Sequence, residues 1–443
     1  MLQLVKFSVM GLFGEFDHQI PLNTQQRVTA LIGPNGLGKT VCLKLIDALF
    51  RKRWSVFALT DFASAEFCFS DGSIISVTHQ NSADTESEVS DSMGVRFTVE
   101  SSDGSMEHWS PRIVEDGTAR ASRIEGYLPF ISRSGPRLWT HDLTGQTYTL
   151  QELVEAFSDQ LPSHITNSVS ITPPPSISGI IKEIDCHLIE TQRLLVFHSD
   201  QSRRGPAQQS ALAISRKAQV LKTVIARELA LYAATSQSLD RSFPRRALQL
   251  GPVAPSENLV SSLAELEELR NGLTDAGILD QEAEDALPQI SEIDSAVATV
   301  LSVYVNDTRR KLDVLAVLRE RILLFKELID SRFFPKTIVV DKSVGFIVKR
   351  NSNVDIPLEK LSSGEQHQLV LFFELLFELK QNALILIDEP ELSLHISWQK
   401  QFISDLQRII SLNQFDVLLA THSPQLIGEW EDLVVELGDV DPE

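Results

Sequence analysis

A glycine-rich loop between an apolar strand and a helix constrains this chain more than any other feature of its sequence. The run RVTALIG, residues 27–33, has the near-continuous apolar character of a strand buried on both faces of a parallel sheet. It continues directly into GPNGLGKT, residues 33–40, and then into VCLKLIDALF, whose apolar residues have helical spacing. A strand, the pattern Gly-x4-Gly-Lys-Thr and a helix, in this order, are typical of a phosphate-binding loop. The sequence therefore predicts an α/β nucleotide-binding fold.

Nucleotide chemistry explains the residue types in this loop. The backbone N–H groups can surround a β-phosphate, and the N-terminus of the helix adds a positive dipole. We expect Lys39 to reach the β- and γ-phosphates, and Thr40 to offer its hydroxyl to Mg²⁺. The alternative is a chance glycine turn, which the flanking strand and helix disfavour. The expected ATP-binding residues here are Gly33, Pro34, Asn35, Gly36, Gly38, Lys39 and Thr40.

Two apolar strands near the other end of the chain each end in side chains suited to the same chemistry. LILIDE places Asp388 and Glu389 directly after four apolar residues, and DVLLATHSP places His422 after a second apolar run. Uncompensated carboxylates at the end of a buried strand are costly, and a Mg²⁺ held by Asp388 would compensate them. Glu389 could then orient or deprotonate a water, and His422 could hydrogen-bond the γ-phosphate. The alternatives are that the acids cap the next helix and that the histidine is structural.

The motif LSSGE opens a long apolar helix between these features. Ser362, Ser363 and Gly364 place hydroxyl and N–H groups at a helix N-terminus, which is an anion site. Glu365 completes a capping box with Ser362, so an ordinary helix cap explains the same residues when they are considered alone. Beside a phosphate loop and LILIDE we favour the anion site, and we expect all four residues to contact a nucleotide.

The middle of the chain changes from strand patterns to helix patterns. Residues 51–130 show short alternating strands, which predict an antiparallel sheet layered against the nucleotide sheet. Residues 131–178 are weakly patterned, with a loop expected at the three prolines 173–175. Residues 184–198 restart the core pattern with HLIET as a strand.

Beyond these strands the sequence predicts a compact helical insertion at residues 200–333, followed by a hairpin at 336–348 that returns the chain to the sheet. Basic residues cluster in the insertion; paired, solvated helix faces explain them better than a surface for nucleic acid or an acidic protein. The stretches with helical spacing are 219–239, 258–273 and 295–334. The last contains a short apolar seam of Leu315, Leu318, Ile322, Phe325 and Ile329.

Composition limits the class of protein. The formal net charge of −20 repels free nucleic acid at long range without excluding a local basic face. No apolar run approaches the roughly 18 residues that cross a membrane, and the N-terminus has a strand pattern rather than a signal-peptide layout, so a cytoplasmic protein is expected. Cys42, Cys68 and Cys186 have no CxxC spacing, which predicts neither disulfides nor a structural zinc site.

Together these motifs resemble the ABC-type ATPase heads of the SMC, Rad50, RecF and OLD class. GPNGLGKT corresponds to Walker A, LSSGE to the signature, LILIDEP to Walker B, ELSLH to the D-loop and THS to the switch histidine. The resemblance implies an α/β P-loop head with a mixed sheet core, an antiparallel β layer and an inserted helical lid or short coiled coil. The two halves of the head are expected at residues 1–199 and 334–443, with the lid at 200–333.

The same resemblance implies an enzyme that hydrolyses ATP to ADP and phosphate with Mg²⁺. In this class two heads enclose two ATP molecules, and the signature of one head contacts the γ-phosphate bound by the other. The chain is therefore expected to form a head-to-head dimer or a higher homo-oligomer. Gln192 in ETQR lies where the family has its Q-loop glutamine, which adds it to Thr40 and Asp388 as an expected metal ligand.

Within the class, the run ELLFELK…LILIDEPELSLH…FDVLLATHSPQLI resembles the ATPase subunits of bacterial anti-phage systems. The most similar are those encoded beside a small Toprim-like effector, as in the PARIS system, with Septu-type and OLD-type ATPases as near relatives. This implies a sensor and scaffold that controls a separately encoded Toprim-like nuclease and responds to a phage protein or to DNA. OLD nucleases continue into a Toprim domain, whereas about twenty residues follow His422 here, so no nuclease domain is expected in this chain. The alternatives are an SMC- or RecF-like repair ATPase that binds duplex DNA through its lid and, less well matched, a transporter ATPase.

Overall fold

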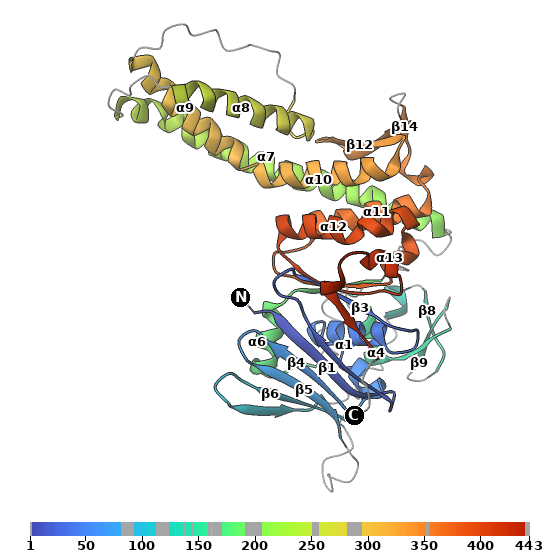
Figure 1. The fold of residues 1–443 in the computed structure, drawn as a ribbon. Coiled ribbons are helices and arrows are strands. Elements are labelled where there is room, and N and C mark those ends of the chain that lie inside the picture. The colour runs from blue at the N-terminus through green and yellow to red at the C-terminus, as the bar shows by residue number, and fades with distance from the viewer. Residues whose placement is uncertain are drawn as a thin grey trace. The chain divides into compact units, whose positions relative to one another are not determined.

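A sheet of parallel strands forms the centre of the unit that contains both ends of the chain (Figure 1). The computed structural model divides into two units: a terminal unit, residues 1–209 with 379–443, and a helical unit, residues 210–378. The structure describes residues 2–80, 93–111, 124–128, 130–135, 138–142, 145–157, 161, 171–190, 206–249, 257–280, 295–350 and 354–438. The domain boundaries expected from the sequence, at residues 199 and 333, stay a prediction. The two units are defined by contacts within each unit, whereas the predicted domains were defined by sequence pattern.

The parallel sheet has the strand order β11-β15-β16-β3-β17 among the described residues. These strands are β11 (Cys186–Glu190), β15 (Leu384–Asp388), β16 (Asp416–Ala420), β3 (Val28–Ile32) and β17 (Val434–Glu436). The apolar residues of the three central strands are buried almost without exception, as the sequence predicted. Because the strands are parallel, their carboxyl ends lie along one edge of the sheet. The residues that follow β3, β16 and β15 therefore come together there.

The predicted antiparallel layer is confirmed. Its strand order is β2-β1-β4-β5-β6-β7. The strands are β1 (Leu4–Leu12), β2 (Phe16–Pro21), β4 (Ser64–Phe69), β5 (Ile74–His79), β6 (Val95–Glu100) and β7 (Met106–Trp109). Helix α1 (Lys39–Phe50) contacts the parallel strands and shares one apolar core with both sheets. A short helix that the sequence did not suggest, α2 (Trp54–Leu59), follows it.

The weakly patterned region holds a small folded module with a core around Trp139. Its elements are η1 (Ile124–Gly126), β8 (Ile131–Arg133), β9 (Leu138–His141), β10 (Thr147–Thr149) and α4 (Leu150–Ala156). Strands of three or four residues are too short to show an alternation, which explains why the sequence gave no signal. A loop was expected at residues 173–175, and this prediction is wrong for Pro175, which is the first residue of helix α6 (Pro175–Glu183). Proline is tolerated there since the first N–H of a helix has no partner within it.

Long helices dominate the helical unit. They are α7 (Pro206–Gln249), α8 (Glu257–Asp275), α9 (Ser295–Asp313) and α10 (Ala316–Phe333). Helix α7 has 44 residues, about 66 Å of helix, and is far longer than the predicted 219–239. The predicted stretch 295–334 is broken between α9 and α10. All five residues of the predicted apolar seam are buried. No described helix is both long enough and apolar enough to span a membrane.

The predicted hairpin exists, but the prediction that it returns the chain to the parallel sheet is wrong. Strands β12 (Lys336–Asp341), β13 (Gly345–Arg350) and β14 (Asp355–Ile356) form a separate antiparallel sheet in the helical unit. Its Phe346 packs against Phe325 of α10 and Phe373 of α11 (Ser363–Phe373). The apolar face of the hairpin is thus buried within this unit, and the next parallel strand in the sequence is β15.

The remaining helical elements follow α11 in the sequence. They are the π-helical turn η4 (Glu374–Glu378), then η5 (Pro390–Ser393), α12 (Ile396–Asn413), α13 (Pro424–Ile427) and η6 (Glu431–Leu433).

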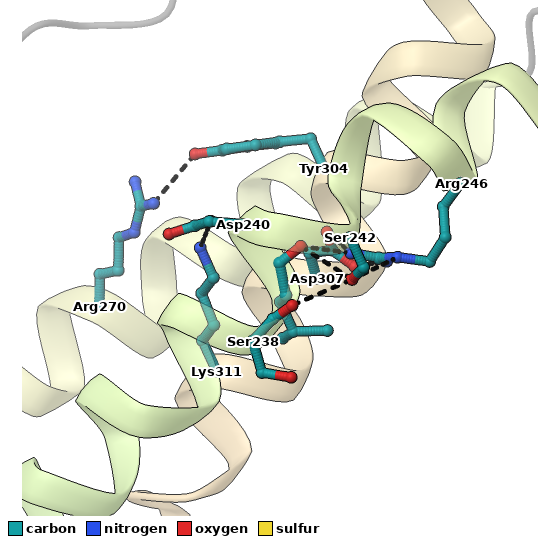
Figure 2. Close-up of polar contacts among 9 residues, drawn as sticks. Ser238, Asp240, Ser242, Arg246, Arg270, Tyr304, Asp307 and Lys311 are labelled. Atoms are coloured by element: carbon teal, nitrogen blue, oxygen red, sulfur yellow. Dashed lines mark hydrogen bonds and ion pairs between the residues drawn. The ribbon is translucent and has the colours of Figure 1, made fainter.

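Ion pairs between helices use several of the basic residues of the helical unit (Figure 2). Arg246 of α7 forms a bidentate pair with Asp307 of α9, and its guanidinium also donates to the Leu239 carbonyl and the Ser242 hydroxyl. Asp307 is only 4% exposed, so its charge depends on this partner. Further pairs are Lys311–Asp240, Arg309–Glu265 and Lys217 with Glu374 and Glu378. The acidic partners favour the structural interpretation of this basic cluster.

The buried pair makes a prediction about stability. Asp307→Asn keeps the shape of the side chain but leaves Arg246 without a counter-charge, and should lower the melting temperature by about 5 °C. The matched change Glu265→Gln removes an acid from an exposed pair and should shift it by less than about 1 °C. Thermal unfolding followed by circular dichroism measures both, and equal shifts would contradict a structural role for the pair.

Candidate functional site

Residues from the two ends of the chain meet at the carboxyl edge of the parallel sheet in the terminal unit. The Thr40 hydroxyl donates to Asp388 Oδ1 at 3.0 Å, although the two residues are 348 positions apart. Lys39 Nζ lies 3.2 Å from His422 Nδ1, across 383 positions. His422 Nε2 lies 3.8 Å from Glu389 Oε1. The structure thus brings together the phosphate loop, both carboxylates and the histidine that the sequence selected.

Two glycines of the loop are required by their surroundings. Gly38 has φ 87°, and a Cβ there would lie 2.4 Å from Leu12 Cδ2 of β1. Gly33 has φ 149°, and a Cβ there would lie 2.5 Å from the Leu437 carbonyl oxygen. The loop tip formed by Pro34, Asn35 and Gly36 is exposed. Helix α1 starts directly after Gly38 without a side-chain cap, so its first N–H groups remain available to an anion.

Lys39 is held inside the loop by its own backbone. Its Nζ donates to the carbonyl oxygens of Gly33 at 2.7 Å and Pro34 at 2.9 Å, and the residue is only 4% exposed. Burial lowers the pKa of Lys39, and the nearby carboxylates of Glu389, Glu391 and Asp388 oppose that shift. An ammonium group surrounded by exchangeable oxygen acceptors is ready to transfer its hydrogen bonds to phosphate oxygens.

Glu389 has a strained backbone. Its φ of 48° and ψ of 53° lie in the left-handed region, which costs about 1–2 kcal/mol for a residue with a Cβ. Its N–H donates to the Ala420 carbonyl at 2.9 Å, which ties the end of β15 to the end of β16. Strain of this kind gathers at functional sites, where the surrounding structure enforces it. The side chains of Glu389 and His422 are 34% and 31% exposed, so water and a nucleotide can reach both.

The oxygen pair of Thr40 and Asp388 fits Mg²⁺. This ion prefers oxygen ligands and usually takes one or two protein groups, completing its shell with water and substrate phosphates. The described residues contain no cluster of three His, Cys, Asp or Glu that could hold a metal by itself. Bound there, Mg²⁺ would neutralise charge on the β- and γ-phosphates. Gln192, the third expected ligand, lies outside the described residues.

Three supporting residues were missed from the sequence. His18 of β2 is buried, with Nε2 2.7 Å from the Leu37 carbonyl of the phosphate loop. Glu391 Oε1 accepts the His422 backbone N–H at 2.6 Å, and Gln399 Oε1 accepts the Ser423 hydroxyl at 2.7 Å. The available signal was His18 itself, a polar residue on the inward face of a strand whose neighbours on that face, Phe16 and Ile20, are apolar.

The LSSGE residues lie in the helical unit. Ser362 is the N-cap of α11: its hydroxyl accepts the Glu365 N–H at 3.3 Å, while Glu365 Oε2 accepts the Ser362 N–H at 2.8 Å. The capping box, which the sequence offered as the alternative to an anion site, is therefore present. Ser362 and Ser363 are exposed, and Gly364 follows them in the first turn. Contact of these residues with a nucleotide stays a prediction.

One family model matches the part of the chain that contains several of these residues. The family model described as an AAA ATPase domain matches residues 250–427, which include LSSGE, both carboxylates and His422 but not the phosphate loop. No curated protein matches the chain. Among solved structures, an Smc head domain with an extended coiled coil from Pyrococcus furiosus, bound to the C-terminal domain of ScpA, has 14% identity and a TM-score of 0.34, covering 99% of this chain and 96% of that one. The SMC head domain from Thermotoga maritima has 12% identity and a TM-score of 0.32, with coverage of 99% and 96%.

The chain is an ATPase with a mixed α/β fold. The AAA ATPase domain match and the assembled phosphate loop, carboxylates and histidine support ATP hydrolysis.

Glu391 should act as a positioning residue for His422. Glu391→Ala removes the acceptor of the His422 N–H, so kcat for ATP hydrolysis should fall about tenfold while KM for ATP changes by less than about twofold. Steady-state kinetics measures both constants. Glu429→Ala removes an exposed acid a short way beyond His422 and should leave both unchanged. An equal loss in the two variants would argue against the assignment.

Proposed function

We propose that this ATPase is the sensor and scaffold subunit of an anti-phage defence complex. In this proposal it controls a separately encoded toxic effector, a Toprim-like nuclease, through ATP-dependent dimerisation of its heads. Dimerisation is supported by one observation: the ATP motifs are divided between the two units. The terminal unit contains the phosphate loop, the carboxylates and His422, while Ser362 and Ser363 lie exposed at a helix N-terminus of the helical unit. An exposed signature is available to a nucleotide held by a second copy.

The positions of the side chains support the following hydrolysis step. Lys39 and the first N–H groups of α1 bind the β- and γ-phosphates. Glu389 accepts a proton from the attacking water, whose oxygen forms a bond to the γ-phosphorus as the bond to the β,γ-bridging oxygen breaks. His422, whose ring lies between Lys39 and Glu389, hydrogen-bonds the γ-phosphate and so senses its presence. Release of that phosphate would remove the contact that the signature of the second copy makes.

The identity of the partner is argued from charge and from motif resemblance. The run around LILIDEPELSLH resembles anti-phage ATPase subunits more than repair ATPases. Arg246, Lys311 and Arg309 of the lid are each paired with a carboxylate, which reduces the charge they could offer to DNA. A net charge of −20 also disfavours long-range attraction to nucleic acid. Both arguments favour a protein partner over duplex DNA.

Glu389→Gln tests the catalytic assignment. The amide keeps the size of the side chain but cannot accept the proton of the attacking water, so kcat should fall by about 10²-fold or more. ATP should still bind, and the variant should accumulate as an ATP-bound dimer in size-exclusion chromatography. Lys39→Ala is the matched control: it should lose ATP affinity by about 30-fold and form no dimer. Normal turnover by Glu389→Gln would refute Glu389 as the base.

Purification from the native operon tests the defence role. A tagged chain should copurify with the product of a neighbouring gene, and that product should become toxic when phage infection stimulates ATP turnover. With the Glu389→Gln variant, which does not turn over ATP, the product of the neighbouring gene should stay bound and non-toxic. Fluorescence anisotropy with a duplex oligonucleotide tests the alternative: tight, salt-dependent binding that Arg309→Ala with Arg310→Ala abolishes would favour the repair ATPase instead.

A further inference from the structure

A lysine outside every ATP motif binds the acidic residue of LSSGE. Lys336, the first residue of β12, places Nζ 2.7 Å from Glu365 Oε1 and 2.8 Å from Oε2. The two side chains are 19% and 13% exposed, so this pair is better shielded from solvent than the exposed pairs of the lid. No ATP motif includes Lys336, and it lies 29 positions before its partner.

Glu365 remains negatively charged because of these contacts. Burial raises its pKa, but the hydrogen bonds from Lys336 and Ser362 outweigh burial and hold the pKa below its usual value. The signature thus carries a carboxylate beside the hydroxyl that is expected to meet a γ-phosphate. An uncompensated carboxylate there would repel the nucleotide.

Lys336 also competes for the oxygen atom that holds the signature serine. Glu365 Oε2 accepts from the Ser362 N–H at 2.8 Å, from the Ser362 hydroxyl at 2.9 Å and from Lys336 Nζ at 2.8 Å. Because three donors share one oxygen, each bond is weaker than it would be alone. Without Lys336 the carboxylate would hold the Ser362 proton more strongly, and that proton could not turn toward a phosphate.

We infer that Lys336 is a positioning residue of the signature, which neutralises Glu365 so that Ser362 can bind the γ-phosphate of an ATP held by a second copy of this chain. The inference rests on the proposed head-to-head dimer. Lys336 contacts no nucleotide in this proposal and acts only through Glu365. Its removal should therefore weaken ATP-dependent dimerisation without affecting how a single chain binds ATP.

The test uses the full chain carrying Glu389→Gln, so that hydrolysis does not empty the site. Lys336→Met should weaken ATP-dependent dimerisation at least about tenfold in analytical ultracentrifugation, with unchanged affinity for a fluorescent ATP analogue at protein concentrations where the chain is monomeric. Adding Glu365→Gln should restore dimerisation to within about threefold of the parent, because glutamine keeps the capping box and carries no charge. Lys342→Met, which removes an exposed pair with Asp280 in the same hairpin, should change neither quantity.

Each outcome decides between a charge effect and a structural one. Failure of Glu365→Gln to rescue Lys336→Met would show that Lys336 merely supports β12, and would overturn the inference. The inference would also be overturned if Lys336→Met dimerised as well as the parent while Ser362→Arg abolished the dimer. If Ser362→Arg leaves the dimer intact, the signature does not face a second ATP. The proposed dimer would then fail, and the inference with it.

Discussion

The hydrogen bond from Thr40 to Asp388 and the contact between Lys39 and His422 hold together a site whose parts lie at opposite ends of the sequence. Both depend on the position of β16 between β3 and β15. Parallel pairing in that order puts the loop after β3, the histidine after β16 and the carboxylates after β15 side by side at one edge. Any chain inserted between residues 190 and 384 is compatible with this site, provided that it leaves these strands in register. The helical unit occupies that interval.

Compensation of buried charge recurs throughout the molecule. Lys39 is nearly inaccessible and has carboxylates as neighbours, Asp307 is paired with Arg246, and Glu365 is paired with Lys336. A buried ion pair adds little net stability by itself, but removal of one member leaves a costly charge. The two ion pairs therefore fix geometry more than they add stability. At Lys39 and Glu365 the geometry that is fixed belongs to the expected ATP contacts.

Much of the fold and site was predictable because the signals are local in sequence. A buried strand followed by polar residues identified β3, β15 and β16 together with Lys39, Asp388 and His422. The supporting contacts were not predictable, because the Glu391–His422 and Lys336–Glu365 hydrogen bonds cross 31 and 29 positions and have no pattern. The assignment of the β12–β13 hairpin to the wrong sheet has a related cause. Alternation identifies a strand, but it does not tell which edge the strand will pair with.

The LSSGE turn shows why a cap and an anion site need not exclude each other. The capping box uses the Ser362 N–H, the Ser362 hydroxyl and the Glu365 N–H. It does not use the N–H groups of Ser363 and Gly364, which precede the hydrogen-bond ladder of α11. The cap fixes the direction of these two donors by ordering the first turn of the helix. A capped N-terminus is therefore a better-ordered anion site than a frayed one, provided that the carboxylate used for the cap is neutralised, and Lys336 meets that condition.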